Sequence, residues 1–322
     1  MRWLVPLILG GVGVALLIGG VERTVKTVRR RALLAGVSAL TLGLLATSLD
    51  LESTAAGIAS AAKGLGTVAA GISVGSVIFL ATAALGLACV LFPFAVRILR
   101  YFLGVFIISA VAASAVLLGG GVNRLEALML LALFAVMVTR GVPHMRTATQ
   151  AEKPPPFPGN GGVATLARTR LAFVATIGLS LVAMTVGAQF LAVAAQKAIA
   201  TMHLSETFLG TVIVAVALSL EEGLIEVLPA WRGTPEIAVG NVLGTTAFLL
   251  TGSLGFVALA FPIHLEPHWT TLQVPALLGA VALATWALTR PRTGRREGVL
   301  LIAYYVLYLA ATWFAGVALR GS

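Results

Sequence analysis

The sequence predicts an all-α polytopic membrane protein with ten transmembrane helices in two five-helix repeats of inverted topology. Three observations support this fold class. Hydrophobic residues make up 59% of the 322 positions and charged residues only 11%, whereas a soluble domain carries about 25% charge. The apolar residues form runs long enough to cross a bilayer. Two stretches from different halves of the chain also match each other.

Ten segments have the length and composition of membrane spans. Their approximate limits are 3–20, 33–62, 67–93, 102–120, 125–140, 170–196, 206–230, 236–261, 270–289 and 298–318. The second and seventh segments are too long for simple spans and contain acidic residues, so we expect each to include a break or an amphipathic extension. The first segment resembles a signal peptide but lacks a small-x-small cleavage site, and we interpret it as a retained span.

A linker rich in proline and glycine divides these spans into two groups of five. It covers residues 141–169, a composition typical of an extended, flexible segment. The predicted domains are therefore a first repeat over 1–140, a cytoplasmic linker over 141–169 and a second repeat over 170–322. Since each half has an odd number of spans, the halves should insert in opposite orientations.

Basic residues are divided unevenly between alternating loops. The loops after the odd-numbered spans hold 17 of the 22 Lys and Arg residues: Arg23, Lys26, Arg29, Arg30, Arg31, Arg97, Arg100, Arg140, Arg146, Lys153, Arg168, Arg170, Arg232, Arg290, Arg292, Arg295 and Arg296. This asymmetry places the odd loops in the cytoplasm and both termini outside. We expect an integral protein of a prokaryotic inner membrane.

The net charge of +10 fits loops that face an anionic leaflet, and nothing resembles a nucleic-acid-binding domain. The expected partners are membrane lipid and transported cations, without nucleic acid and without an obligatory protein partner. Because Cys89 is the single cysteine, no internal disulfide can form.

Two acidic stretches correspond between the halves: ATSLDLESTAAG, residues 46–57, and ALSLEEGLIEVL, residues 217–228. A carboxylate in hydrocarbon costs roughly 2.5–3.5 kcal/mol on insertion scales, so acids inside spans are usually functional. Carboxylates buried in corresponding places of two repeats predict a cation site at the centre of a transporter.

The segments that follow the acids align without a gap. KGLGTVAAGISVGSVIFL, residues 63–80, and RGTPEIAVGNVLGTTAFL, residues 232–249, are identical at six of eighteen positions, including three glycines. Glu52 pairs best with Glu222, which requires one inserted residue after the acid. The alternative pairs Asp50 with Glu221 and requires two.

These motifs resemble the α-repeats of the calcium/cation antiporter superfamily, the sodium/calcium exchangers and their relatives. The family pattern reads G-T-S-x-P-E, then a basic-Gly turn and G-N-x-x-G-S-N. This chain has A-T-S-L-D-L-E from Ala46 and A-L-S-L-E-E from Ala217, and later G-I-x-x-G-S-V from Gly71 and G-N-x-x-G-T-T from Gly240. Both prolines are missing, and Ile72, Val77 and Thr246 replace asparagines, so the family's four-ion stoichiometry cannot be carried over.

The acids and the resemblance together nominate oxygen ligands for a metal ion: Glu52, Glu222, Asp50, Ser48, Thr47, Ser219, Ser76, Asn241, Thr245 and Glu226. Some of these residues also have a structural interpretation. Glu226 could form a rim salt bridge with Arg232. Asp50 should point away from Glu52 on a regular helix, so either acid could be the first-repeat ligand. The hydroxyls could bond back to their own helices.

The resemblance implies a secondary antiporter that exchanges Ca²⁺ for Na⁺, with no cofactor. Exchange follows if the carboxylates must be neutralised by one ion or another before the protein can switch. A proton can also neutralise them, so a Ca²⁺/H⁺ antiporter is the alternative. A non-transporting scaffold or sensor with degraded sites is a third interpretation. An intramembrane enzyme is not expected, since an HExxH motif is absent and all four His lie in loops or at the ends of predicted spans.

Overall fold

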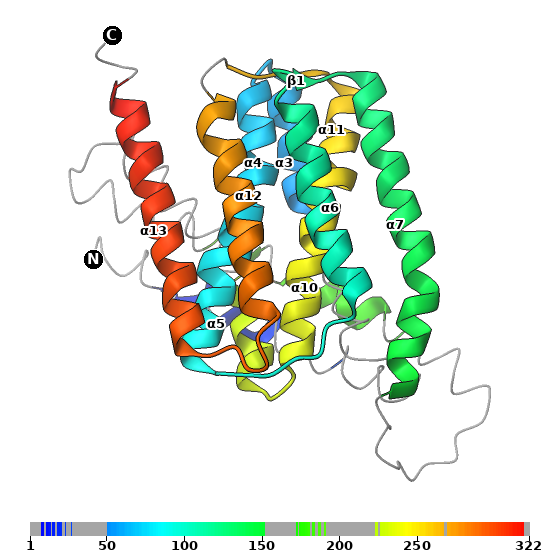
Figure 1. Cartoon of the computed structure of the whole chain (residues 1–322), viewed down its shortest axis with the longest axis vertical. Coiled ribbons are helices and arrows are strands. Elements are labelled where there is room, and N and C mark those ends of the chain that lie inside the picture. Colours follow the sequence, from blue (N-terminus) through cyan, green and yellow to red (C-terminus); the bar gives the residue numbers. More distant parts are fainter. Residues whose placement is uncertain are drawn as a thin grey trace.

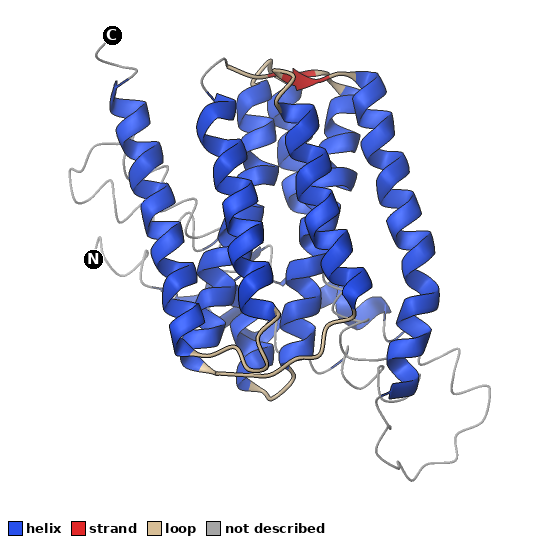
Figure 2. Ribbon diagram, viewed as in Figure 1, coloured by secondary structure: helices blue, strands red, loops and turns tan. Residues whose placement is uncertain are grey.

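The computed structural model describes the backbone of residues 50–151, 223–224, 226–266 and 269–318, with isolated helical positions between residues 8 and 27 and between 172 and 190. These residues form a bundle of helices that run roughly alongside one another, with short loops at both ends (Figures 1 and 2). The predicted spans 170–196 and 206–230 lie mostly outside the described residues, as does most of 33–62, and the span 3–20 is described only at scattered positions.

The elements follow in this order: α3 (Leu51–Ala62), α4 (Gly66–Phe79), the π-helical η1 (Leu80–Ala84), α5 (Leu85–Leu91), α6 (Arg100–Leu117), β1 (Gly121–Val122), α7 (Arg124–Ala151), α10 (Pro235–Ala247), the π-helical η2 (Phe248–Ser253), α11 (Leu254–Ala260), β2 (Ile263–His264), α12 (Trp269–Leu288) and α13 (Arg295–Ala318). Within the described residues, five helical stretches are long and apolar enough to cross a membrane: 66–91, 100–117, 235–260, 269–288 and 295–314. Each agrees with a predicted span to within a few residues. The helix predicted at 125–140 is longer than expected, because α7 continues to Ala151, past the expected start of the linker.

The two halves of the described chain share one local structure. Gly233 follows Gly64 by 169 positions, and both have a positive φ, 73° and 76°, which glycine adopts without the Cβ clash of other residues. The same separation relates the first residues of α4 and α10, of α5 and α11, and of α6 and α12. The gapless alignment of the sequence therefore extends over consecutive helices.

The halves run in opposite directions through the bundle. Val122 pairs with Ile263 in the antiparallel β1–β2 ladder, and Phe94 pairs with Thr293 in an isolated antiparallel bridge. Ile263 is 169 residues after Phe94, and Thr293 is 171 after Val122, so the two pairings correspond. In Figure 1 the β1–β2 ladder lies at the top of the bundle and the loop from α5 to α6 at the bottom. The loop that holds β2 is the second-half equivalent of the loop from α5 to α6, so equivalent loops lie at opposite ends. The total of ten helices stays a prediction.

The last helix of each half packs on the long helix of the other half. Phe79 contacts Tyr305 edge-on with ring centroids 5.6 Å apart, and Phe248 contacts Phe134 in the same way at 5.7 Å. A Cβ added to Gly86 would lie 2.9 Å from the Gly298 carbonyl oxygen. These close crossings bind the two halves together.

The corresponding Gly255 is similarly crowded, because an added Cβ would lie 3.1 Å from the Ala127 carbonyl oxygen. A small residue therefore allows the same crossing in both halves. Two glycines of the sequence motif, Gly71 and Gly75, do not serve this purpose. A Cβ at Gly71 or Gly75 would meet no described atom within 4 Å.

Both long helices widen into a π-helical turn at corresponding positions, η1 and η2. In each, a threonine hydroxyl donates to the carbonyl four residues earlier: Thr82 to Ile78, and Thr251 to Ala247 at 2.5 Å. A π-turn disrupts the regular i→i−4 ladder, and these hydroxyls give the affected carbonyls a partner. π-Turns inside α-helices occur frequently at functional sites.

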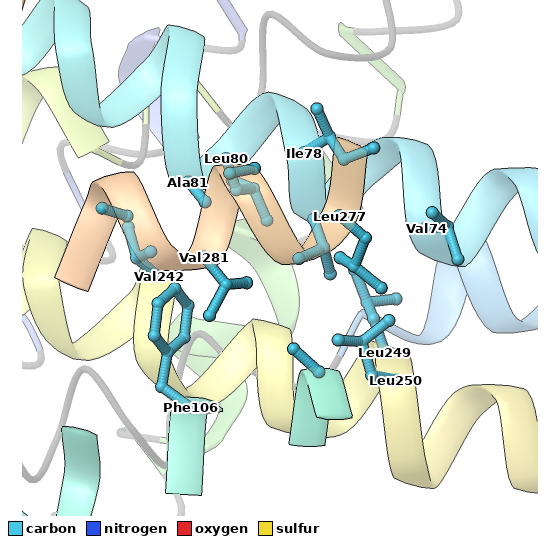
Figure 3. Close-up of a cluster of buried hydrophobic side chains, with 14 of the residues drawn as sticks. Val74, Ile78, Leu80, Ala81, Phe106, Val242, Leu249, Leu250, Leu277 and Val281 are labelled. Carbon is cyan, nitrogen blue, oxygen red and sulfur yellow. The ribbon is translucent and has the colours of Figure 1, made fainter. Parts of the chain in front are cut away.

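The core between these widened helices is apolar. Side chains from α4, η1, α6, α10, η2 and α12 meet there, as Figure 3 shows for Val74, Ile78, Leu80, Ala81, Phe106, Val242, Leu249, Leu250, Leu277 and Val281. Leu80 and Leu249 are fully buried at corresponding positions of the two halves. The polar candidates must therefore lie around this core and not within it.

Candidate cation site

The site's first helix begins in the middle of a predicted span. Asp50 is the N-cap of α3, with φ −81° and ψ 81°, and its side chain accepts a hydrogen bond from the Ser53 amide at 2.8 Å. Aspartate suits this position because its carboxylate satisfies an orphan N–H and complements the helix dipole. The residues directly before Asp50 lie outside those described, so the expected break or amphipathic extension of the long second segment stays a prediction.

Asp50 thus has a structural contact, but only for one carboxylate oxygen. The other oxygen, Oδ2, is buried and has no hydrogen-bond partner among the described residues. A buried carboxylate oxygen without a partner is costly. It is therefore available to a bound cation.

Glu226 lies in the interior of the protein and not at its rim. Its side chain is 0% exposed, and neither carboxylate oxygen has a hydrogen-bond partner within the described part of the chain. The expected alternative, a rim salt bridge with Arg232, does not fit this burial. The Arg232 guanidinium instead lies over the ring of the exposed Trp231, 4.7 Å from its centroid.

The next helix supplies an amide and hydroxyls close to Glu226. The Asn241 side chain lies near the Glu226 carboxylate without a hydrogen bond of normal geometry to it, and the Thr245 hydroxyl donates to Asn241 Oδ1 at 3.3 Å. Both α10 residues are 3% exposed, and the Thr246 hydroxyl is buried without a described partner. Apolar α10 therefore presents a short polar stretch inside the bundle.

Ser76 is the first-half counterpart of Thr245, 169 residues earlier, and is half-buried on α4. Glu52 lies in the first turn of α3, but its side chain is outside the described residues. Thr47, Ser48, Ser219 and Glu222 lie outside them altogether. The expected approach of Glu52 to Glu222 accordingly stays a prediction.

The described ends of the two acidic stretches can be placed in register. The turns after them correspond without an insertion, since Leu65 N bonds to Ser60 O at 3.0 Å and Thr234 N to Pro229 O at 2.9 Å. The separation of 169 places Gly57 in correspondence with Glu226. Glu221 and Glu222 lie outside the described residues, so the pairing of Glu52 with Glu222 stays a prediction.

Sequence reasoning missed two residues beside Asp50. The hydroxyls of Thr54 and Ser253 lie 2.8 Å apart in the interior, although 199 residues separate them. The search relied on residue types that recur in both repeats, and neither residue recurs. The position equivalent to Ser253 is Ala84, and that equivalent to Thr54 is Gly223. No recurring pattern could have revealed them.

The described donors are oxygens from single acids, an amide and hydroxyls. Within the described residues, no group of three or more His, Cys, Asp or Glu side chains could hold a metal ion. Carboxylate, amide and hydroxyl oxygens are the ligands of hard cations such as Ca²⁺. A helical membrane bundle that repeats one local structure and buries oxygen donors in its interior is typical of secondary transporters.

Comparison with known proteins specifies the family. The sodium/calcium exchanger protein family matches residues 5–140 and 172–314, one match on each side of the linker. The chain belongs to this family. It is therefore a membrane cation antiporter and not an enzyme.

Individual relatives differ in coverage. The inner membrane protein YrbG of Escherichia coli is 28% identical over 254 residues, which cover 75% of this chain and 76% of that protein. The sodium/calcium exchanger MaX1 of Methanosarcina acetivorans is 28% identical over 140 residues, 43% of this chain and 40% of that one. The Ca(2+)/H(+) antiporter ChaA of Bacillus subtilis is 27% identical over 177 residues, 54% and 48% of the two chains.

The fold also matches a solved structure. The sodium-calcium exchanger NCX_Mj, soaked with Na⁺ and Sr²⁺, superposes with a TM-score of 0.78 at 20% identity. The match covers 96% of this chain and 99% of NCX_Mj. This likeness establishes the exchanger fold.

Proposed function

We propose that this protein exchanges Ca²⁺ for a monovalent cation across a prokaryotic inner membrane, with Na⁺ as the counter-ion that the family resemblance implies. The main support is Glu226, a fully buried carboxylate whose oxygens have no hydrogen-bond partner among the described residues. An ionised group so deep needs a counter-charge. The oxygens of Asn241 and Asp50 are of the kind that a hard divalent cation binds.

The acids of the two repeats carry the exchange in this proposal. Glu52 and Glu222 hold Ca²⁺ near the middle of the membrane, together with Ser76, Thr245 and Asn241. An empty site with several negative charges is too costly to pass through an occluded state. The protein therefore switches only when Ca²⁺ or the counter-ion neutralises the site. By analogy with the family, spans 1 and 6 rock against the rest.

Proton coupling is the second candidate. Ile72, Val77 and Thr246 stand where the family pattern has asparagines, so fewer oxygens remain for Na⁺. A proton needs no coordination shell and can neutralise a carboxylate by itself. The B. subtilis relative is a Ca²⁺/H⁺ antiporter by name.

Flux in proteoliposomes tests the proposal. Full-length protein is reconstituted, and Ca²⁺ uptake is measured with an outward Na⁺ gradient at equal pH, and separately with an outward proton gradient in Na⁺-free buffer. Uptake driven by Na⁺ alone supports Ca²⁺/Na⁺ exchange, and uptake driven by protons alone supports Ca²⁺/H⁺ exchange. Protein-free liposomes give the background. If neither gradient drives Ca²⁺ uptake above this background, the proposed function is wrong.

A further inference from the structure

A hydrogen bond between the two halves lies directly behind the start of α3. The Thr54 hydroxyl on α3 and the Ser253 hydroxyl in η2 are 2.8 Å apart. Thr54 is 8% exposed and Ser253 0%. Pairs of buried hydroxyls fix the relative position of their helices, because either group alone would lose its partner.

Thr54 also holds the N-cap residue. Its hydroxyl donates to the Asp50 carbonyl at 2.8 Å, and its amide approaches the same oxygen at 3.3 Å. A hydroxyl has one hydrogen to donate, so the Ser253 hydroxyl donates to Thr54 in this arrangement. A continuous chain of donors thus runs from η2 of the second half to the main chain of Asp50.

This chain leaves Asp50 with one unused oxygen. Its carbonyl is bound by Thr54 and its Oδ1 by the Ser53 amide at 2.8 Å. Oδ2 is buried without a described partner. The carboxylate is therefore held in one orientation with a single buried oxygen available.

The corresponding hydrogen bond cannot form at the equivalent positions of the two halves. The separation of 169 that matches the halves carries Thr54 to Gly223 and Ser253 to Ala84, neither of which has a side-chain hydroxyl. Helix geometry alone does not require the pair, since η1 and α5 form the same elements as η2 and α11 without it. The pair thus occurs at only one of these two corresponding places, the one next to Asp50.

We propose that Thr54 and Ser253 are positioning residues that hold Asp50 Oδ2 as a ligand of the transported divalent cation. A helix of one half thereby orients an acid of the other. The inference rests on the proposed function and extends it to a particular ligand oxygen. Loss of the hydrogen bond should weaken cation binding without slowing the transport step itself, because the carboxylate remains but is no longer held in place.

The test uses three variants of the full chain in proteoliposomes. Ser253→Ala installs the residue of the corresponding position, and Thr54→Val removes the other hydroxyl while keeping its shape. Each should raise the KM for Ca²⁺ roughly two- to tenfold, the range given by one net hydrogen bond, with kcat unchanged. Thr54→Ser retains the hydroxyl and should restore a KM close to that of the wild type.

A matched control separates positioning from general helix packing. The Thr285 hydroxyl on α12 donates to Val281 O of its own helix at 2.7 Å, so Thr285→Val should leave the KM unchanged. Asp50→Asn removes the charge through which the pair acts. Adding Ser253→Ala to Asp50→Asn should therefore change the KM no further.

The outcomes are distinct. An unchanged KM in Ser253→Ala and Thr54→Val, with only the melting temperature lowered, would show a structural bond and overturn the inference while leaving Ca²⁺ transport intact. Independent effects of Asp50→Asn and Ser253→Ala would overturn it too. Wild-type proteoliposomes without Ca²⁺ flux would refute the proposed function and the inference with it.

Discussion

Glu226 and Asn241 lie near each other inside the second half, on the two helices that the Arg232–Gly233 turn joins, without a hydrogen bond of normal geometry between them. Asn241 Oδ1 already accepts from Thr245, so its amide N–H groups are the donors that can reach the carboxylate. Glu226 is fully buried, and neither of its carboxylate oxygens has a hydrogen-bond partner among the described residues, so an ionised group there needs a counter-charge. In the proposed function the transported cation supplies that charge.

Glu226→Gln should reduce Ca²⁺ flux at least tenfold without destabilising the fold. Glutamine keeps the shape of the side chain and removes its charge. Because the buried charge has no counter-ion in the described structure, its removal should not lower the stability of the fold. Flux assays and melting curves in detergent would measure both effects. A variant that transports at the wild-type rate would assign Glu226 a role in packing only.

Asn241→Ala should weaken Ca²⁺ transport less than Glu226→Gln, roughly two- to tenfold, because one neutral ligand of several is lost. The comparison of KM values for Ca²⁺ in the two variants checks this order. An effect of Asn241→Ala larger than that of Glu226→Gln would speak against a charge-based site.

Glu52→Gln and Glu222→Gln should each abolish exchange, since each removes a charge that balances a divalent cation. Glu126→Gln is the matched control. Its carboxylate is exposed and accepts from the Asn123 amide at 2.8 Å at the start of α7, so flux should persist. Robust Ca²⁺ flux in the Glu52→Gln/Glu222→Gln double variant would refute the proposed mechanism, whichever ion is coupled.

Gly86→Val should destabilise the contact between α5 and α13. The added side chain would meet the Gly298 carbonyl, and such overpacking costs about 1–3 kcal/mol. Gly104→Val on α6 provides the control, because a Cβ there meets no described atom within 4 Å. Melting temperatures in the same detergent should fall for the first variant only. Equal melting temperatures would mean that the crossing adjusts freely.

The linker around Gly161 should face the cytoplasm, as the distribution of basic residues predicts. Gly161→Cys in a Cys89→Ser background should react with a membrane-impermeant thiol reagent in inside-out vesicles and not in intact cells. Cys89 itself is buried, so its replacement removes little background. Labelling from outside the cell would reverse the predicted orientation of every loop.

The class of protein and most described helix limits followed from the sequence. A bilayer requires every backbone group to be satisfied within the span, which leaves long apolar helices as the solution, and such helices are visible as apolar runs. The repeat also followed, because glycines align at fixed positions of both halves, and two of them, Gly64 and Gly233, have the positive φ that glycine adopts readily. The π-turns did not follow, since LATAA and FLLTGS read as ordinary apolar helix.

The sequence by itself determined that acids and hydroxyls lie within spans, and at which positions the halves repeat. Only the tertiary structure decided that Glu226 is interior, that Asp50 caps a helix and that Thr54 bonds to Ser253. The physical reason is that periodicity and spacing encode local conformation and the face of a helix, whereas contacts between residues 199 positions apart arise from how helices of opposite halves cross. Where the halves differ, as at Ser253 and Ala84, no internal repeat carries the information.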